Sequence, residues 1–293
     1  MNERVLIVNA DDFGMTEAGD EAILGLFQAG RITSSTILAP AKRAKSACQS
    51  AAVRDLAVGV HWTLHAEWAE ETWLPSVGAE RVPSLCENGA LIPGSARASK
   101  AAKSGDVTRE LEAQYRFLME HDVVPDHADS HGGTLYGING RLFFLNAFRL
   151  CKRYGLPFRF PRRSDFLRRQ FGHEPNGALK AAHRIIVASA DAHGVQLIDD
   201  FITNPYPVAK IEGYAQLAAY YEREIASAKE GITEVFLHPS LPDKTLLKRT
   251  PEWQKRAWEY EFLTSDAFDN LLKREGFVLS SWKNAPFGSR KHK

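Results

Sequence analysis

The sequence predicts an α/β fold in which parallel strands form a closed or nearly closed barrel. Strand-like and helix-like segments alternate about eight times along the chain, which indicates a parallel sheet with crossover helices. No low-complexity linker or shift in composition interrupts the 293 residues, so residues 1–293 are expected to form one domain. A doubly wound open sheet is the alternative. No Gly-x-Gly-x-x-Gly follows the first strand, so a dinucleotide-binding fold has little support.

The sequence of residues 5–65 predicts three strands and two helices. An apolar run at 5–8 is typical of a buried strand, and Thr16 can cap the helix that follows it. Gly30 suits the end of that helix, and Pro40 stops the β-branched run that comes next. The expected strands are 5–9, 32–38 and 56–65, and the expected helices are 17–29 and 42–54.

Residues 66–105 predict an irregular insertion, because they contain several prolines and widely spaced glycines and no sustained periodicity. Loops of this length are often functional. Beyond the insertion, helical spacing and strand-like runs alternate again. The expected helices are 106–122, 142–154, 178–192, 214–229 and at least one within 253–274, and the expected strands or strand ends are 123–131, 158–161, 195–200, 233–238 and 277–282.

Composition narrows the class of protein. The chain is 44% hydrophobic and 25% charged with a net charge of +1, which is ordinary for a globular protein and disfavours nucleic acid as a partner. Cys48, Cys86 and Cys151 are far apart and odd in number, which fits a reduced, cytoplasmic protein. The N-terminus does not resemble a signal peptide, and no apolar stretch approaches membrane-spanning length, so no membrane partner is expected.

Acids and histidines stand at the ends of five expected strands. The carboxyl ends of parallel barrel strands meet at one mouth, where active sites lie. A helix cap would explain one acid of the first pair, but core packing does not readily explain polar groups at five strand ends. The residues are Asp11 and Asp12, His61, His131, Asp199 and Asp200, and His238.

This set of residue types suggests a hydrolase. One aspartate and two histidines can hold a divalent ion and leave coordination positions open. Such an ion polarises a carbonyl and activates water, a neighbouring aspartate can act as general base, and a histidine on the opposite rim can protonate a leaving group. Period-two alternation places His65 on the same face as His61, so His65 is a secondary candidate, as is His127.

Five motifs in this order resemble the YdjC family of carbohydrate deacetylases, also called the ChbG/HpnK family. The motifs are LIVNADDFG, GRITSSTIL, GVHWTLH, HADSH and EVFLHPS, spread from residue 6 to residue 240. The resemblance implies an irregular (β/α) barrel of seven or eight strands, similar to NodB-type polysaccharide deacetylases. It also implies a divalent metal ion and hydrolysis of the N-acetyl group of an amino sugar.

The resemblance also implies roles for particular residues. Asp12, His61 and His131 match the metal ligands, Asp11 the catalytic base, and His238 the general acid. Arg159 or Arg162 matches an arginine near the substrate, and Asp199 matches a late acid of the family pattern. Among the ions, Mg²⁺ is favoured, with Zn²⁺ and Mn²⁺ as alternatives. The expected partner is an N-acetylated sugar, and a homodimer is compatible with the sequence.

The chain departs from the family pattern after His131. The family motif usually continues with two further histidines, and here those positions are Gly133 and Leu135. The substrate pocket is therefore expected to differ from that of chitooligosaccharide deacetylases, while the reaction type is retained.

Two other functions fit parts of the sequence. A metal-dependent hydrolase of another bond, such as a phosphoester, is disfavoured because no glycine-rich phosphate loop is present. A non-catalytic carbohydrate-binding protein on the same barrel would use Trp62, Trp68 and Trp73 to stack on sugar rings. The presence of both Asp11 and Asp12 argues against it, because binding alone does not need a base beside a metal ligand.

Overall fold

The computed structural model describes residues 3–287 and contains a strongly curled parallel sheet. Hydrogen bonding connects its main strands in the order β6-β3-β2-β1-β8-β7. Single parallel bridges join Ala128 to Phe158 and Phe158 to Leu197, so the sheet curls round and closes between β6 and β7. The barrel expected from the sequence is therefore confirmed. The strands are β1 Arg4–Phe13, β2 Ser34–Ile37, β3 Val58–Trp62, β6 Ala128–Ser130, β7 Asp200–Ile202, β8 Gly231–Leu237 and β9 Val278–Leu279.

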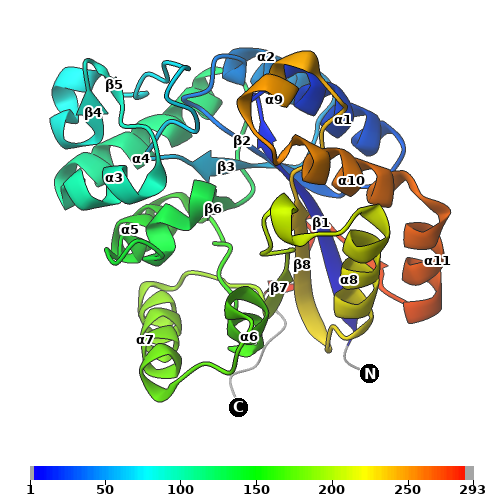
Figure 1. Cartoon of the computed structure of the whole chain (residues 1–293). Coiled ribbons are helices and arrows are strands. Elements are labelled where there is room, and N and C mark those ends of the chain that lie inside the picture. The colour runs from blue at the N-terminus through cyan, green and yellow to red at the C-terminus, as the bar shows by residue number, and fades with distance from the viewer. Residues whose placement is uncertain (1–2, 288–293) are drawn as a thin grey trace.

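Helices surround the sheet, with α8 and α10 on one side of the strands and α3 and α5 on the other (Figure 1). Thr16 caps the first helix as expected, because its hydroxyl accepts a hydrogen bond from the backbone N–H of Gly19. The segment 253–274 is divided in two, and the Ser265 side chain caps the second helix. The helices are α1 Glu17–Gln28, α2 Ala44–Val53, α3 Ser95–Ala101, α4 Ser104–Glu120, α5 Phe144–Tyr154, α6 Asp165–Phe171, α7 Gly177–His193, α8 Tyr214–Ala226, α9 Lys244–Arg249, α10 Trp253–Thr264 and α11 Asp266–Glu275.

The insertion 66–105 contains more regular structure than its sequence suggests. It includes α3 and a two-stranded antiparallel sheet of β4, Cys86–Glu87, and β5, Ala90–Leu91. Trp62 and Trp73 are fully buried and Trp68 is 8% exposed, so these three rings pack in the core. The idea that they form a stacking platform for sugar rings is wrong for this conformation, because none of them presents a free face.

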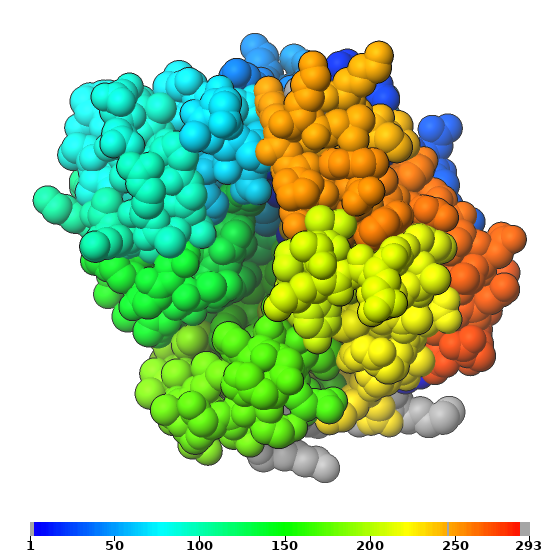
Figure 2. Space-filling model, viewed as in Figure 1, coloured from blue at the N-terminus to red at the C-terminus, as the bar shows by residue number. Residues whose placement is uncertain are grey.

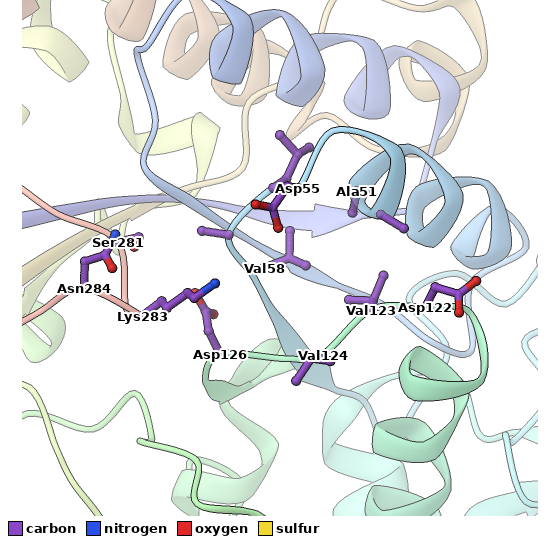
Figure 3. A pocket seen from close by; sticks show the side chains of 13 residues that line it. Ala51, Asp55, Val58, Asp122, Val123, Val124, Asp126, Ser281, Lys283 and Asn284 are labelled. Atoms are coloured by element: carbon purple, nitrogen blue, oxygen red, sulfur yellow. The ribbon is translucent and has the colours of Figure 1, made fainter.

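The amino end of the barrel is closed by the last part of the chain. β9 pairs with the start of β1, and Trp282 lies in the interior, where its indole N–H donates to Glu234 at 3.1 Å and its ring stacks on His127 at 4.5 Å. Beside the segment that contains Trp282, a cavity of about 390 Å³ opens between the loops that precede β3 and β6 (Figure 3).

The strand predicted over 195–200 is displaced toward the C-terminus. Only Leu197 of the apolar run makes a bridge, and β7 itself begins at Asp200, opposite Thr233 near the start of β8. Asp199 and Asp200 thus lie at the amino end of their strand, and the prediction that they end it is wrong. Among residues 3–287, no helix is long and apolar enough to cross a membrane.

Candidate active site

The carboxyl ends of the strands bring one aspartate and two histidines together. Asp12 Oδ1 lies 3.4 Å from His61 Nε2 and 3.4 Å from His131 Nδ1, and the two nitrogens are 3.3 Å apart. All three side chains are almost completely buried. The convergence expected from the strand ends is therefore present.

A bulge in β1 explains how two consecutive aspartates face the same mouth. Successive side chains of a regular strand point to opposite faces. Here the pairing of β1 with β2 shifts between Ala10 and Phe13, so one extra residue is accommodated, and Asp12 has a φ of +72°. A bulge of this kind redirects side chains, and Asp11 and Asp12 both reach the centre of the barrel.

Each histidine is oriented by a second carboxylate. His61 Nδ1 lies 2.6 Å from Asp129 Oδ1, and His131 Nε2 lies 3.0 Å from Glu67 Oε2. The remaining nitrogen of each ring then points at Asp12, which is the arrangement usual for metal-binding histidines. Burial lowers the pKa of both rings, but the surrounding carboxylates outweigh it and raise the pKa of His61 to about 10 and that of His131 to about 9.

The donor set fits a divalent cation. Asp12 Oδ1 is buried between the two imidazoles and has no hydrogen-bond partner among residues 3–287. Spacings of 3.3–3.4 Å between donor atoms suit ligands that share one ion at bond lengths of about 2.0–2.2 Å. The other oxygen of Asp12 accepts a hydrogen bond from Arg256 Nη2 at 2.7 Å.

Asp11 is held in a fixed, ionised state beside this group. Arg159 binds it through two hydrogen bonds, of 2.7 and 2.8 Å, and Asn9 Nδ2 adds a third at 2.7 Å. Burial raises the pKa of Asp11, but Arg159, helped by His61 and His238, outweighs burial and lowers the pKa to about 2. His238 Nε2 lies 3.8 Å from Asp11 Oδ2, and the His238 side chain is 33% exposed, so it links the buried group to solvent.

Arg159 is an internal residue of the barrel. Its side chain is 2% exposed and also contacts Asp129 and Glu234, at 2.6 and 2.8 Å. It therefore holds buried carboxylates in place, and its contact with the predicted site is through Asp11.

The structure does not bring the other two predicted substrate residues to this group. Arg162 pairs with Asp191 at 2.7 Å and is partly exposed. Asp199 Oδ2 accepts a hydrogen bond from the backbone N–H of Ile232, near the start of β8. Since His238 follows the other end of β8, about 20 Å of strand separates it from Asp199.

Several residues that surround the site were not predicted from the sequence. Glu234 could have been found, because alternation along 234–238 places it on the same strand face as His238. Glu67 lies in the insertion, and Arg256 and Glu259 lie on α10. The sequences of these segments contain no motif that indicates a functional site. These residues are near the site only because of tertiary packing.

The replaced histidine positions have two different structural roles. Leu135 is fully buried, so it contributes to the core rather than to the wall of the mouth. Gly132 and Gly133 have φ values of +54° and +62°, and a Cβ at Gly132 would lie 3.0 Å from the His65 ring. Gly132, which precedes the first replaced position, leaves room for His65 to stack on His131, with ring centroids 4.9 Å apart, whereas a Cβ at Gly133 would clash with Ile138 Cδ1.

The surface is hollowed between the cyan and green segments and the yellow and orange segments of the chain (Figure 2). The site draws on both sides of this groove, because His131 belongs to the green segment and Arg256 to the orange one. The fold and the site together define a parallel α/β barrel protein with a histidine–carboxylate group at the mouth of the barrel.

Comparison with known proteins gives the family. Residues 5–274 match the family model described as YdjC-like protein, so the chain belongs to the YdjC-like family. A carbohydrate deacetylase of Enterococcus faecalis (strain ATCC 700802 / V583) is 28% identical over 97% of this chain and 99% of its own. A chitooligosaccharide deacetylase of Proteus mirabilis (strain HI4320) is 26% identical over 96% and 98%.

A solved structure from Enterococcus faecalis V583 is similar in fold to nearly the whole chain. It is named as a candidate cellobiose-phosphate cleavage protein, and it superposes with a TM-score of 0.76 at 25% identity. The match covers 96% of this chain and 98% of that one.

Proposed function

We propose that this protein is a metal-dependent carbohydrate deacetylase that hydrolyses the N-acetyl group of an amino sugar or oligosaccharide. The observation that carries the proposal is Asp12 Oδ1, a buried carboxylate oxygen that lies 3.4 Å from one nitrogen of His61 and one of His131 and forms no hydrogen bond with any other described residue. The names of the full-length relatives, carbohydrate deacetylase and chitooligosaccharide deacetylase, support the reaction class.

Two residues of the chain, Asp11 and His238, divide the proton transfers between them. A bound divalent ion would polarise the acetyl carbonyl and acidify water. Asp11, kept ionised by Arg159, takes the proton of the attacking water, and His238 donates a proton to the amine nitrogen as the C–N bond breaks. The products are acetate and the free amine of the sugar.

The types of donor atom at the site also indicate which ion to test first. Imidazole nitrogens suit Zn²⁺, whereas Mg²⁺ prefers carboxylate, carbonyl and water oxygens. With two imidazoles and one carboxylate, we propose Zn²⁺ as the first ion to test, ahead of the Mg²⁺ favoured from sequence. A cytoplasmic location remains part of the proposal, and Cys48, Cys86 and Cys151, none of them in a disulfide, are compatible with it.

The test is acetate release from a panel of N-acetylated mono- and oligosaccharides, before and after treatment with a chelator and after return of Zn²⁺, Mn²⁺ or Mg²⁺. We expect activity to disappear with the chelator and to return with one of the ions. The Asp12→Ala variant should lose both metal and activity, whereas Asp165→Ala, which removes an exposed acid paired with Lys229, should retain both.

Other outcomes would redirect the assignment. An Asp12→Ala protein with full metal content and full activity would show that the ion is held elsewhere. Turnover of phosphoester substrates alone would favour the other hydrolase class, and sugar binding without turnover would favour a carbohydrate-binding protein.

A further inference from the structure

Helix α10 contacts the site at two points. Arg256 Nη2 donates to Asp12 Oδ2 at 2.7 Å. Near the following turn of the same helix, Glu259 accepts hydrogen bonds from the backbone N–H of His238 and from the Tyr221 hydroxyl, both at 2.7 Å. The backbone of Ser240 also donates to the carbonyl of Arg256. One helix thus contacts both Asp12, at the end of β1, and His238, which follows the neighbouring strand β8.

The two oxygens of Asp12 have different partners. Oδ2 is engaged by the guanidinium, and only Oδ1 faces the imidazole nitrogens. The Arg256 side chain is 14% exposed and Asp12 is 3% exposed, so the pair is shielded from solvent and its charges are weakly screened.

We propose that Arg256 is a positioning residue that limits Asp12 to a single ligand oxygen, so that the ion keeps a coordination position open for water and substrate. This inference rests on the proposed metal-dependent function and refines it. If Oδ2 were free, both oxygens could bind the ion, because carboxylates ligate in either one- or two-oxygen mode. The second oxygen of Asp12 would then occupy a coordination position that water or substrate needs.

This role predicts opposite effects on metal binding and turnover. Replacing Arg256 with methionine removes a positive charge from the neighbourhood of a cation and frees a second ligand oxygen, and both changes favour metal binding. Turnover should fall because an open position is lost. A residue that merely supported the fold would lower both quantities, and a residue that bound substrate would raise KM while leaving kcat unchanged.

The experiment compares the wild type, Arg256→Met, Arg256→Lys and Arg249→Met. Arg249 is a suitable control because it lies on the neighbouring helix α9 and pairs with Glu71 rather than with Asp12. Zn²⁺ affinity is measured by calorimetric titration of the metal-free proteins, and kcat and KM are measured on the loaded ones. The absorption spectrum of the Co²⁺-loaded forms reports coordination number, since its intensity decreases as ligands are added.

We expect Arg256→Met to bind Zn²⁺ at least as tightly as the wild type, to give a weaker Co²⁺ spectrum, and to lose about 10–100-fold in kcat with a smaller change in KM. Arg256→Lys, which keeps the charge, should lie between the two, and Arg249→Met should match the wild type in Zn²⁺ affinity and Co²⁺ spectrum. Thermal unfolding of the metal-free proteins checks that each variant folds.

Weaker Zn²⁺ binding by a folded Arg256→Met protein, an unchanged kcat, or a change confined to KM would overturn the inference. These outcomes are distinct from a failure of the proposed function. A wild-type chain that takes up no metal, or takes it up without deacetylating any sugar, would overturn that function on the wild-type measurements alone.

Discussion

The interior of the barrel and its mouth use the same residue types in opposite ways. In the interior, one guanidinium, that of Arg159, contacts three buried carboxylates, those of Asp11, Asp129 and Glu234. At the mouth, Asp12 Oδ1 lies 3.4 Å from a nitrogen of each of two imidazoles and forms no hydrogen bond with any other described residue. The interior carboxylates share one cation of the chain, whereas Asp12 has Arg256 on Oδ2 only and directs Oδ1 toward a place for an exchangeable ion.

The difference concerns how the charge of each buried carboxylate is balanced, and Asp11, the proposed base, is balanced in the same way as the interior carboxylates. A buried carboxylate is expensive unless it is paired, and the interior satisfies that rule with Arg159. Asp129 connects the two regions, because its oxygens contact Arg159 on one side and His61 on the other. The orientation of His61 at the mouth therefore depends on the charge balance inside the barrel.

Replacing Arg159 should have the largest effect. Arg159→Met leaves three carboxylates without their shared cation and should lower the free energy of unfolding by about 3–5 kcal/mol, the usual loss when one partner of a buried ion pair is removed. Arg162→Met is the matched control, because the Arg162 side chain is partly exposed and its partner is Asp191, away from the interior carboxylates. Its effect should stay within about 1 kcal/mol.

Urea unfolding of both variants measures this difference. Equal stabilities of Arg159→Met and Arg162→Met would mean that the interior carboxylates do not need Arg159, and the contrast between interior and mouth would not hold.

His238 should give the next largest effect, confined to activity. His238→Gln removes the proposed general acid and should lower kcat by about 10²-fold, with Zn²⁺ affinity unchanged. Burial lowers the pKa of His238 below its usual 6.5, so the protonated ring is lost as pH rises through that lower value. The kcat/KM of the wild type should therefore decline on the alkaline side from below pH 6.5.

The pH profile of the variant distinguishes this role from a structural one. In His238→Gln the alkaline decline should be absent, because no proton is left to lose. A profile of unchanged shape at a lower rate would assign the general acid to another group.

Much of the mouth could be predicted from sequence, and the reasons are physical. A parallel barrel collects the carboxyl ends of its strands, so Asp12, His61 and His131 were expected to meet without knowledge of any contact. Arg256 and Glu67 could not be found in this way. They reach the site from a helix and an insertion whose positions depend on packing across the whole chain.

The error at Asp199 has a different cause. The apolar side chains of Val195, Leu197 and Ile198 are buried, as their residue types predict, but burial does not fix where the hydrogen-bonded ladder begins. The first hydrogen bond of the ladder with β8 is donated by the backbone N–H of Asp199 to the carbonyl of Ile232, and Asp200 is the first residue paired across it. An acid that follows an apolar run can therefore lie at either end of a strand, and the sequence did not distinguish the two.

The smallest expected effect tests this placement of Asp199. Its Oδ2 accepts from the buried N–H of Ile232 at 2.7 Å, far from the mouth. Asp199→Ala leaves that N–H without its acceptor and should lower the free energy of unfolding by about 1–3 kcal/mol, while kcat, KM and Zn²⁺ affinity remain those of the wild type. A rise in KM without loss of stability would restore the role in substrate binding that the sequence suggested. Because Asp12→Ala should show the reverse pattern, with metal and activity lost, the two substitutions together test whether a buried acid of this barrel serves the fold or the chemistry according to the end at which it lies.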